Sequence, residues 1–154
     1  MPRCFIGAIF FKHSFISRLF TLGKNERLKS RKIIERLFRN GKNFSVSPFR
    51  ISYLFDDQVF CQQVNPPGVK FGVAVGSKNF KRAVDRNRIK RLMRETYRLQ
   101  KKPLQESVVS QKKHLALFVV YTGKGLPDFQ TVNKQMGLIL QRLFREISSP
   151  GEEK

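Results

Sequence analysis

Apolar and polar positions repeat with two different periods along the chain, and these periods predict which segments are helices and which are strands. Residues 30–41, SRKIIERLFRNG, carry apolar side chains at the spacing of one helix face, at positions 33, 34, 37 and 38. Gly41 predicts the end of this helix in the left-handed conformation. A later helix is predicted over 131–147, where one face carries Val132, Met136, Ile139, Leu140, Leu143 and Ile147.

Three segments have the character of β-strands. Residues 47–55 alternate between two faces, one with Phe49, Ile51 and Tyr53 and the other with Arg50, Ser52 and Leu54. Residues 69–76 and 114–123 are almost continuously apolar, which is typical of strands covered on both faces. We therefore expect 69–76 to lie in the centre of the sheet. Residues 56–68 predict a loop that closes with a Pro-Pro-Gly turn.

The segment 82–98, RAVDRNRIKRLMRETYR, combines a helical period with concentrated positive charge. We expect a helix from about Ala83 to Leu99 that ends before Pro103. Its apolar face is predicted to pack on the sheet and carries Ile89, Leu92, Met93, Thr96 and Leu99. The opposite face is predicted to carry Asn87, Lys90, Arg91, Arg94 and Arg98, with Arg86 and Arg88 at its two borders.

The predicted order is α-β-β-α-β-α. Two antiparallel strands followed by a crossover to a third strand indicate an α+β sandwich, with helices packed on a small mixed sheet. We expect one domain over 22–148 and a short tail over 149–154. Residues 1–21 are expected to be a poorly ordered extension, with an organelle transit peptide or an upstream start codon as the alternatives.

The strong positive charge of the chain is not explained by the predicted α+β sandwich alone. Lys and Arg number 31 against 11 Asp and Glu, which gives a formal net charge of +20. Such an excess destabilises a compact state by self-repulsion, so it predicts a polyanionic partner, either a nucleic acid or an anionic membrane surface. The basic helix favours the nucleic acid, because solvated helix faces usually alternate in sign and this face does not.

Particular side chains suit contacts with phosphate. The planar guanidinium of Arg binds phosphate oxygens as a fork, and the amide of Asn87 can bond a phosphate, a ribose hydroxyl or a base edge. Lys78, Lys81 and Arg82 precede the basic helix, where free backbone N–H groups also favour an anion.

Candidate catalytic chemistry in the chain itself is sparse. Cys4 and Cys61 are far apart and form no CxxC or Cys/His pattern, so neither a zinc site nor a disulfide is predicted, and a reducing cytoplasm fits best. His114 opens an apolar strand, Asp56 and Asp57 suit a turn, and the Gly-Lys-Gly at 123–125 lacks the full phosphate-loop pattern. No catalytic residue and no metal site in the protein is therefore predicted.

The basic helix also carries a recognisable motif. Ala83 and Val84 followed by RNRIKRLMRE resemble the RNR motif in the protein subunit of bacterial ribonuclease P. The strand FGVAVGSKN and the segments RLFRNG, FVVYTGKG and LQRLFR are similar to that family in order and spacing. The resemblance covers residues 22–147.

The resemblance implies a fold and a function. The fold would be a sandwich of the kind found in the second domain of ribosomal protein S5, with an unusual left-handed βαβ crossover. The protein would bind the catalytic RNA through the RNR region and would bind the 5′ leader of precursor tRNA between the sheet and the first helix. The RNA, with Mg²⁺, would hydrolyse the phosphodiester. The resemblance implies a cytoplasmic ribonucleoprotein, with no membrane and no obligate protein partner.

By position, the resemblance also implies two sets of site residues. Those facing the catalytic RNA would be Arg86, Asn87, Arg88, Lys90, Arg91 and Arg94. Those bordering the leader would be Lys78, Arg82 and Phe38, with Arg50 and Ser52 on the first strand. The chain departs from the family at Ser77, where a Lys is usual, and at Ile34, where an aromatic ring is usual. Position 34 therefore has no ring to stack on a leader base, and Phe38 fits a place in the hydrophobic core as well as one at the leader surface.

Three other functions fit parts of the sequence. A non-catalytic RNA-binding protein, such as a ribosomal protein, fits the composition. A DNA-binding regulator would place the basic helix in a major groove, but no helix-turn-helix spacing precedes it. A membrane-surface protein would use residues 1–20, which leaves the basic helix unexplained.

Overall fold

The computed structural model describes residues 22–55 and 68–148. The predicted extension over 1–21, most of the predicted loop and the tail over 149–154 lie outside the described residues. The elements in chain order are η1 (Lys24–Glu26), α2 (Arg31–Asn40), β1 (Lys42–Val46), β2 (Phe49–Phe55), β3 (Gly68–Val75), α4 (Ala83–Gln100), α5 (Lys102–Ser110), β4 (His114–Tyr121) and α6 (Phe129–Ser148).

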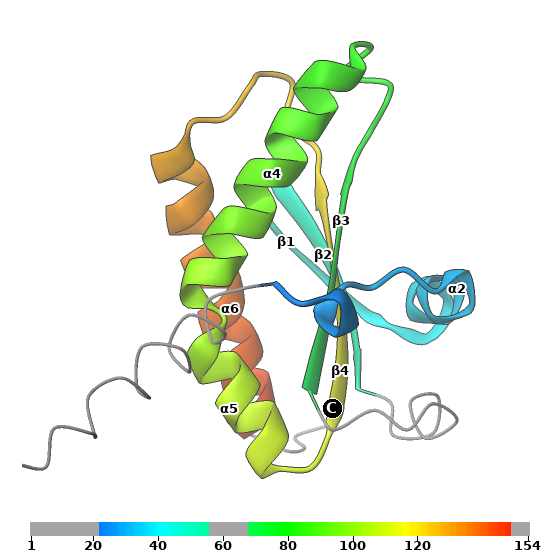
Figure 1. Ribbon diagram of the computed structural model, residues 1–154, viewed down its shortest axis with the longest axis vertical. Coiled ribbons are helices and arrows are strands. Elements are labelled where there is room, and N and C mark those ends of the chain that lie inside the picture. Colours follow the sequence, from blue (N-terminus) through cyan, green and yellow to red (C-terminus); the bar gives the residue numbers. More distant parts are fainter. Residues whose placement is uncertain (1–21, 56–67, 149–154) are drawn as a thin grey trace, which may run out of the picture.

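The strands form one mixed sheet in the order β1-β2-β4-β3. β2 pairs antiparallel with both β1 and β4, and β3 pairs parallel with β4. Helices α4, α5 and α6 cover one face of the sheet, and α2 lies on the other (Figure 1). The predicted α+β sandwich is confirmed, and the crossover from β3 through α4 and α5 to β4 is left-handed, as the resemblance implies.

The central strand is β4, so the expectation that 69–76 lies in the centre of the sheet is wrong. β3 is an edge strand, and β4 separates it from β2. The segment beside η1 covers this edge, because the Leu28 amide donates to the Phe71 carbonyl at 3.0 Å and Arg27 forms a bridge with Phe71. An edge strand whose outer side is covered in this way can remain almost continuously apolar.

Three of the described elements, the single-turn η1 and the longer β1 and α5, are not predicted by the pattern. β1 is short, and its residues are exposed or half-buried, so its hydrophobic signal is weak. α5 begins at Lys102, and Pro103 lies in its first turn, where a proline costs no intrahelical hydrogen bond. Pro103 therefore marks the start of a helix as well as the end of the one before it.

Gly41 does end α2, but in an extended conformation with φ −76° and ψ 151° rather than the predicted left-handed one. A Cβ at this position would lie 2.2 Å from the Leu37 carbonyl oxygen and 3.0 Å from that of Tyr53. Glycine is required here by the close approach of the backbone, and not by a positive φ.

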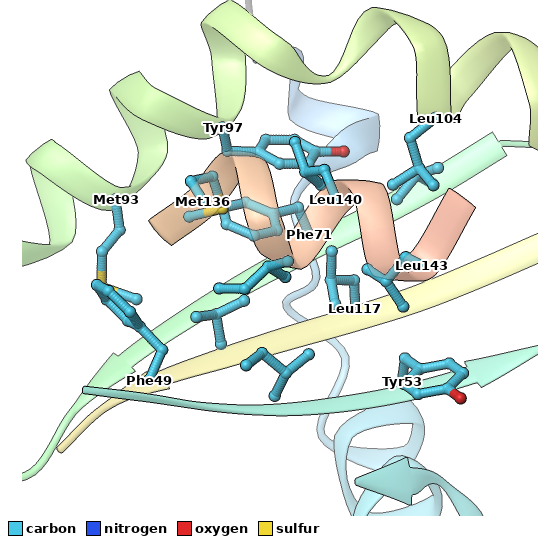
Figure 2. Close-up of a cluster of buried hydrophobic side chains, with 14 of the residues drawn as sticks. Phe49, Tyr53, Phe71, Met93, Tyr97, Leu104, Leu117, Met136, Leu140 and Leu143 are labelled. Carbon is cyan, nitrogen blue, oxygen red and sulfur yellow. The ribbon is translucent and has the colours of Figure 1, made fainter. Parts of the chain in front are cut away.

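The main core lies between the sheet and the layer of α4, α5 and α6. Figure 2 shows Met93 and Tyr97 of α4 and Met136 of α6 directed toward the side chains of the strands. The ring of Tyr97 stacks on Phe71 with 3.8 Å between the ring centroids. A second, smaller core lies under α2 and comprises Leu28, Ile33, Leu37 and Ala116. The two cores hold helices on both faces of the sheet.

None of the described helices is both long enough and apolar enough to cross a membrane.

Candidate nucleic-acid interface

The outward side of α4 gathers cations on a firmly anchored helix. Ile89, Met93, Thr96 and Tyr97 are buried, while Leu99 remains 43 % exposed. The buried face is therefore rotated toward Tyr97 relative to the predicted one. Asn87, Arg88, Arg91 and Arg94 are exposed, and we call these four residues the RNR face.

A concavity of about 660 Å³ lies along the RNR face. Its lining combines Asn87, Arg88 and Arg91 with apolar Val84 and Leu92, and it also includes Glu95, which is paired with Arg98. Val84 is 76 % exposed, so this surface offers apolar contact beside the guanidinium groups. Such a mixture suits a nucleic acid, because phosphates accept from the arginines and the sugars and bases offer apolar faces.

Arg86 has a different environment from its neighbours in the motif. It is half-buried, and its Nη1 donates to the carbonyl oxygens of Phe80 and Lys81, both at 2.7 Å. These bonds hold the preceding loop against the first turn of α4. Arg86 therefore braces the fold, and its contact with RNA stays a prediction.

Two other cations of α4 are less available than the sequence suggests. Lys90 is half-buried. Arg98 forms an ion pair with Glu95, in which its Nε donates to the carboxylate at 2.9 Å. The hydrogen bond from Arg98 lowers the pKa of Glu95, so the carboxylate stays charged and offsets Arg98. The positive charge of the outward side is therefore concentrated toward the N-terminal half of α4.

The loop before α4 is tied to the neighbouring loop of the sheet. Asn79 Nδ2 donates to the carbonyl oxygens of Thr122 and Gly123, at 3.0 and 3.1 Å. Lys78 and Arg82, both predicted leader contacts, are exposed on this loop. These two cations therefore stand on a fixed loop at the end of β3.

The predicted strand residues differ in accessibility. Arg50 is exposed, whereas Ser52 is only 2 % exposed and donates its hydroxyl proton to Asn43 Oδ1 at 2.6 Å. The unpredicted strand β1 places Asn43 directly opposite Ser52. Ser52 is therefore not a surface residue, and its expected place at the leader surface is not supported by its burial.

Phe38 lies at the exposed border of α2. It is 50 % exposed, and its ring meets Phe118 of β4 edge to face with 5.4 Å between centroids. The sequence leaves open whether Phe38 belongs to the core or to the surface. In the structure, its ring contacts Phe118 on one side, and the rest of the side chain is exposed. Ile34 instead packs against the smaller core.

Part of the sheet face beside Phe38 is open. α2 packs over Leu54 and Ala116, and it is the only described helix on this face. Two same-face rows further along, beyond the row that contains Phe118, Arg50 lies opposite Val120, and Ala74 pairs with Val120 on the other side. We call this area, bordered by Phe38 and Phe118 and containing Arg50, Val120 and Ala74, the open sheet face.

The predicted residues thus fall on two separate surfaces. The RNR face belongs to the layer of α4, α5 and α6, and the open sheet face lies on the opposite side of the sheet (Figure 1). The loop with Lys78 and Arg82 connects the end of β3 to the start of α4.

A further basic site, at the start of α2, is not predicted from the sequence. A cavity of about 210 Å³ at the start of α2 is lined by Lys24, Arg27, Lys29 and Lys70 among others. Burial lowers the pKa of the Lys70 ammonium. The cations in 24–31 are visible in the sequence, but Lys70 joins them only because η1 runs along the edge of β3.

Within residues 22–55 and 68–148, no three His, Cys, Asp or Glu side chains gather as metal ligands. The two surfaces can bind phosphates, sugars and bases, and they can therefore orient a bound RNA.

Comparisons with known proteins agree with this geometry. A family model described as Ribonuclease P matches residues 22–144. A "Ribonuclease P protein component" of Porphyromonas gingivalis is 35 % identical over 130 residues, which cover 84 % of this chain and 91 % of the relative. One of Chlorobium phaeobacteroides is 31 % identical over 130 residues, covering 80 % and 88 %.

Solved structures show the same fold. The RNase P protein of Staphylococcus aureus superposes with a TM-score of 0.59 at 17 % identity, covering 77 % of this chain and 94 % of the other. The RNase P protein of Thermotoga maritima superposes with a TM-score of 0.58 at 24 % identity, covering 76 % and 96 %.

Proposed function

The chain belongs to the ribonuclease P protein family, and we propose how its two surfaces divide the binding of RNA in that enzyme. It is a protein subunit of the endoribonuclease holoenzyme that processes the 5′ end of tRNA, and it associates with ribonuclease P RNA. In our proposal the RNR face of α4 carries that association. The open sheet face, together with Lys78 and Arg82, binds the 5′ leader of precursor tRNA.

The arrangement of α4 is the observation that carries the proposal. Three exposed arginines and an exposed amide stand on a helix whose other face is buried in the core. Because the helix is fixed before RNA arrives, little ordering entropy is lost when the phosphates bind. Backbone contacts of this kind set the position and register of an RNA without reading its sequence.

The open sheet face supports binding of a single strand. The free face of Phe38 can stack a base, which is worth about 1–3 kcal/mol, and Arg50 can meet a phosphate. Lys78 and Arg82 extend the positive charge toward the RNR face. Ser52 has no role in this proposal because it is buried.

Hydrolysis and Mg²⁺ are assigned to the RNA in this proposal, as the resemblance to the family implies. The protein residues bind and orient the two RNAs, in the cytoplasm where tRNA would be processed. No step of the chemistry is assigned to a protein side chain.

A reconstitution tests the function. Purified protein is mixed with a ribonuclease P RNA and precursor tRNA at low Mg²⁺, and removal of the 5′ leader is scored. We expect cleavage with both macromolecules and none with the protein alone. If the protein gives no stimulation while the RNA cleaves by itself at high Mg²⁺, the proposed function is wrong.

The assignment of the RNR face is tested by the salt dependence of RNA binding. Changing Arg88, Arg91 or Arg94 to Ala should each reduce the log–log slope by about 0.7–0.9, since each phosphate contact releases counterions. Lys102→Ala removes the same charge from exposed α5 and is the matched control. Equal slopes for the control and the three variants would remove the RNR face from the proposal.

A further inference from the structure

The loop between β3 and α4 concentrates positive charge that it does not itself offset. Lys78, Lys81 and Arg82 lie within it, and the segment 76–84 contains no acidic residue. Like charges so close together repel one another and favour a spread arrangement of the loop. The loop therefore needs contacts from outside to keep its cations in one place.

The two halves of this loop are held by different contacts. Phe80 is only 7 % exposed, and the centroid of its ring lies 6.0 Å from that of Tyr121. Arg86 of α4 also binds the Phe80 carbonyl, at 2.7 Å. The first half of the loop, which carries Lys78, is held by the hydrogen bonds that Asn79 makes to the loop after β4.

Asn79 suits this contact because its amide supplies two N–H donors. Its Nδ2 donates to the Thr122 carbonyl at 3.0 Å and to the Gly123 carbonyl at 3.1 Å. β3 and β4 are parallel, so the loops that follow them leave the same end of the sheet (Figure 1). One side chain therefore fastens the first half of the basic loop to its neighbour.

The loop that accepts these bonds is itself fixed by the end of β4. The Tyr121 hydroxyl donates to the Gly125 carbonyl at 2.8 Å and so closes the turn after the strand. A Cβ at Gly123 would lie 2.3 Å from this hydroxyl oxygen, so the close approach of the ring requires glycine. Asn79 is therefore bound to a loop whose shape is already set.

Thr122 extends the same connection to β2. Its amide and its hydroxyl both donate to the Pro48 carbonyl, at 2.9 and 2.8 Å. Pro48 stands two residues before Arg50, which is exposed on the open sheet face. A continuous path of hydrogen bonds thus joins the loop that carries Lys78 to the strand that presents Arg50.

We propose that Asn79 and Thr122 are positioning residues for the 5′ leader. They hold Lys78 in a fixed place relative to Arg50, so that phosphates of one extended strand meet both cations without rearrangement of the protein. A site that is set in advance loses little entropy when its ligand binds. This inference rests on the proposed function, because leader binding by Lys78 and Arg50 is its premise, and neither positioning residue needs to touch RNA.

Asn79→Leu removes the amide donors at nearly unchanged volume and tests the inference in the reconstituted holoenzyme. Single-turnover cleavage is measured for two precursor tRNAs, one with a long leader and one with a single-nucleotide leader. For the long leader, the holoenzyme concentration that gives half the maximal rate should rise several-fold, while the maximal rate stays the same. Both values should be unchanged for the single-nucleotide leader, because it has no strand of phosphates to span the two cations.

The salt dependence of that half-saturating concentration gives a second measurement. For the long leader, Asn79→Leu should lower the log–log slope by about 0.7, which is the value of one phosphate contact with a single strand. A several-fold weaker interaction with an unchanged slope would contradict a role through Lys78.

A double-variant cycle shows whether Asn79 acts through Lys78. In the Lys78→Ala chain, adding Asn79→Leu should cause no further loss for the long leader, because the cation that Asn79 positions is gone. Thr122→Val keeps the amide bond to Pro48 and removes only the hydroxyl, so its effect should be smaller and should also vanish in Lys78→Ala. A loss of equal size with and without Lys78 would overturn the positioning role.

Gln100→Met is the matched control. The Gln100 amide also donates twice, to the Asn133 carbonyl at 2.9 Å and to its side chain at 2.6 Å, but it joins α4 to α6 instead of the leader loops. This variant should leave cleavage of both precursors unchanged even where its melting temperature falls as far as that of Asn79→Leu. An equal weakening by Gln100→Met would overturn the inference in favour of a general effect of stability.

The same measurements separate the two proposals. If the unchanged chain gives the long leader no advantage over the single-nucleotide leader, the proposed leader binding fails, and this inference fails with it. If that advantage is present and Asn79→Leu retains it, only the positioning role is overturned.

Discussion

Tyr97 places a polar group where the core offers no partner. Its side chain is fully buried, and its hydroxyl has no hydrogen-bond partner among the described residues. Burial raises the pKa of this phenol, so it stays protonated and neutral. The flat stack on Phe71 is the contact that keeps the ring in place.

We expect Tyr97→Phe to leave stability unchanged or to raise it, because a buried unsatisfied polar group costs about 1–3 kcal/mol. The free energy of unfolding from urea denaturation measures the effect. Tyr121→Phe is the matched control, since the Tyr121 hydroxyl donates to the Gly125 carbonyl at 2.8 Å and its loss should destabilise. A larger loss for Tyr97→Phe than for the control would show that the hydroxyl has a partner.

Arg86 and Arg88 flank the same asparagine but should respond differently to substitution. Arg86→Ala should lower the free energy of unfolding by about 1–3 kcal/mol, because the Phe80 and Lys81 carbonyls lose their charged donor. Arg88→Ala should change stability by less than about 0.5 kcal/mol, as for other surface substitutions, while it weakens RNA binding. Thermal melts and RNA titrations on both variants separate the two roles, and equal melts would contradict the bracing role.

At the scale of elements, one ion pair joins η1 to the start of α5. Lys101 is only 1 % exposed, and its ammonium meets the Glu26 carboxylate at 2.8 Å. Burial alone would raise the pKa of Glu26, but hydrogen bonds from Lys101, Gln105 and the Gly23 amide lower it overall. The pair holds the segment that covers the edge of β3.

Glu26→Gln should destabilise the chain by about 3–5 kcal/mol, because the buried Lys101 ammonium loses its ion pair with the Glu26 carboxylate. The double variant with Lys101→Met should recover most of this loss. Unfolding free energies of the two single variants and the double variant form the cycle that measures the coupling. Additive effects would exclude the ion pair as the link between η1 and α5.

The same carboxylate makes stability depend on pH in a defined direction. The folded-state pKa of Glu26 is depressed, so its contribution is present above the unfolded-state pKa and is lost as the pH falls through the folded-state value. Between pH 5 and pH 3, the unchanged chain should therefore lose more stability than Glu26→Gln. Parallel curves over that range would contradict this.

Some of the helices and strands can be predicted from the sequence and others cannot. The long periodic elements α2, α4 and α6 are predictable because each buries a repeated apolar face. β1 is too short and too polar to be recognised, so the burial of Ser52 and its hydrogen bond to Asn43 of β1 are not predicted. The place of β3 depends on which strands pair and on the covering segment at Leu28, which no local pattern encodes.

At the scale of the whole molecule, the net charge predicts the class of partner from the sequence alone, but it does not predict where the charged surfaces lie. The net charge of +20 predicts a polyanionic partner without any structure. The division into an RNR face and an open sheet face requires the fold, because Asn87 and Arg50 lie on opposite layers. The bracing role of Arg86 and the cavity around Lys70 are likewise results of tertiary contacts.

The same charge predicts that anions stabilise the free protein. Repulsion among cations opposes the compact state, and an anion that binds only the folded chain stabilises it by RT ln(1 + [L]/Kd). Sodium sulfate should therefore raise the melting temperature more than sodium chloride does at equal ionic strength, because a divalent anion can bridge the cations of the RNR face. The triple variant Arg88→Ala, Arg91→Ala and Arg94→Ala should lose much of the sulfate-specific increase, whereas Lys102→Ala should retain it. A melting temperature that is independent of salt would show that repulsion in the folded chain is already offset by its own acidic groups.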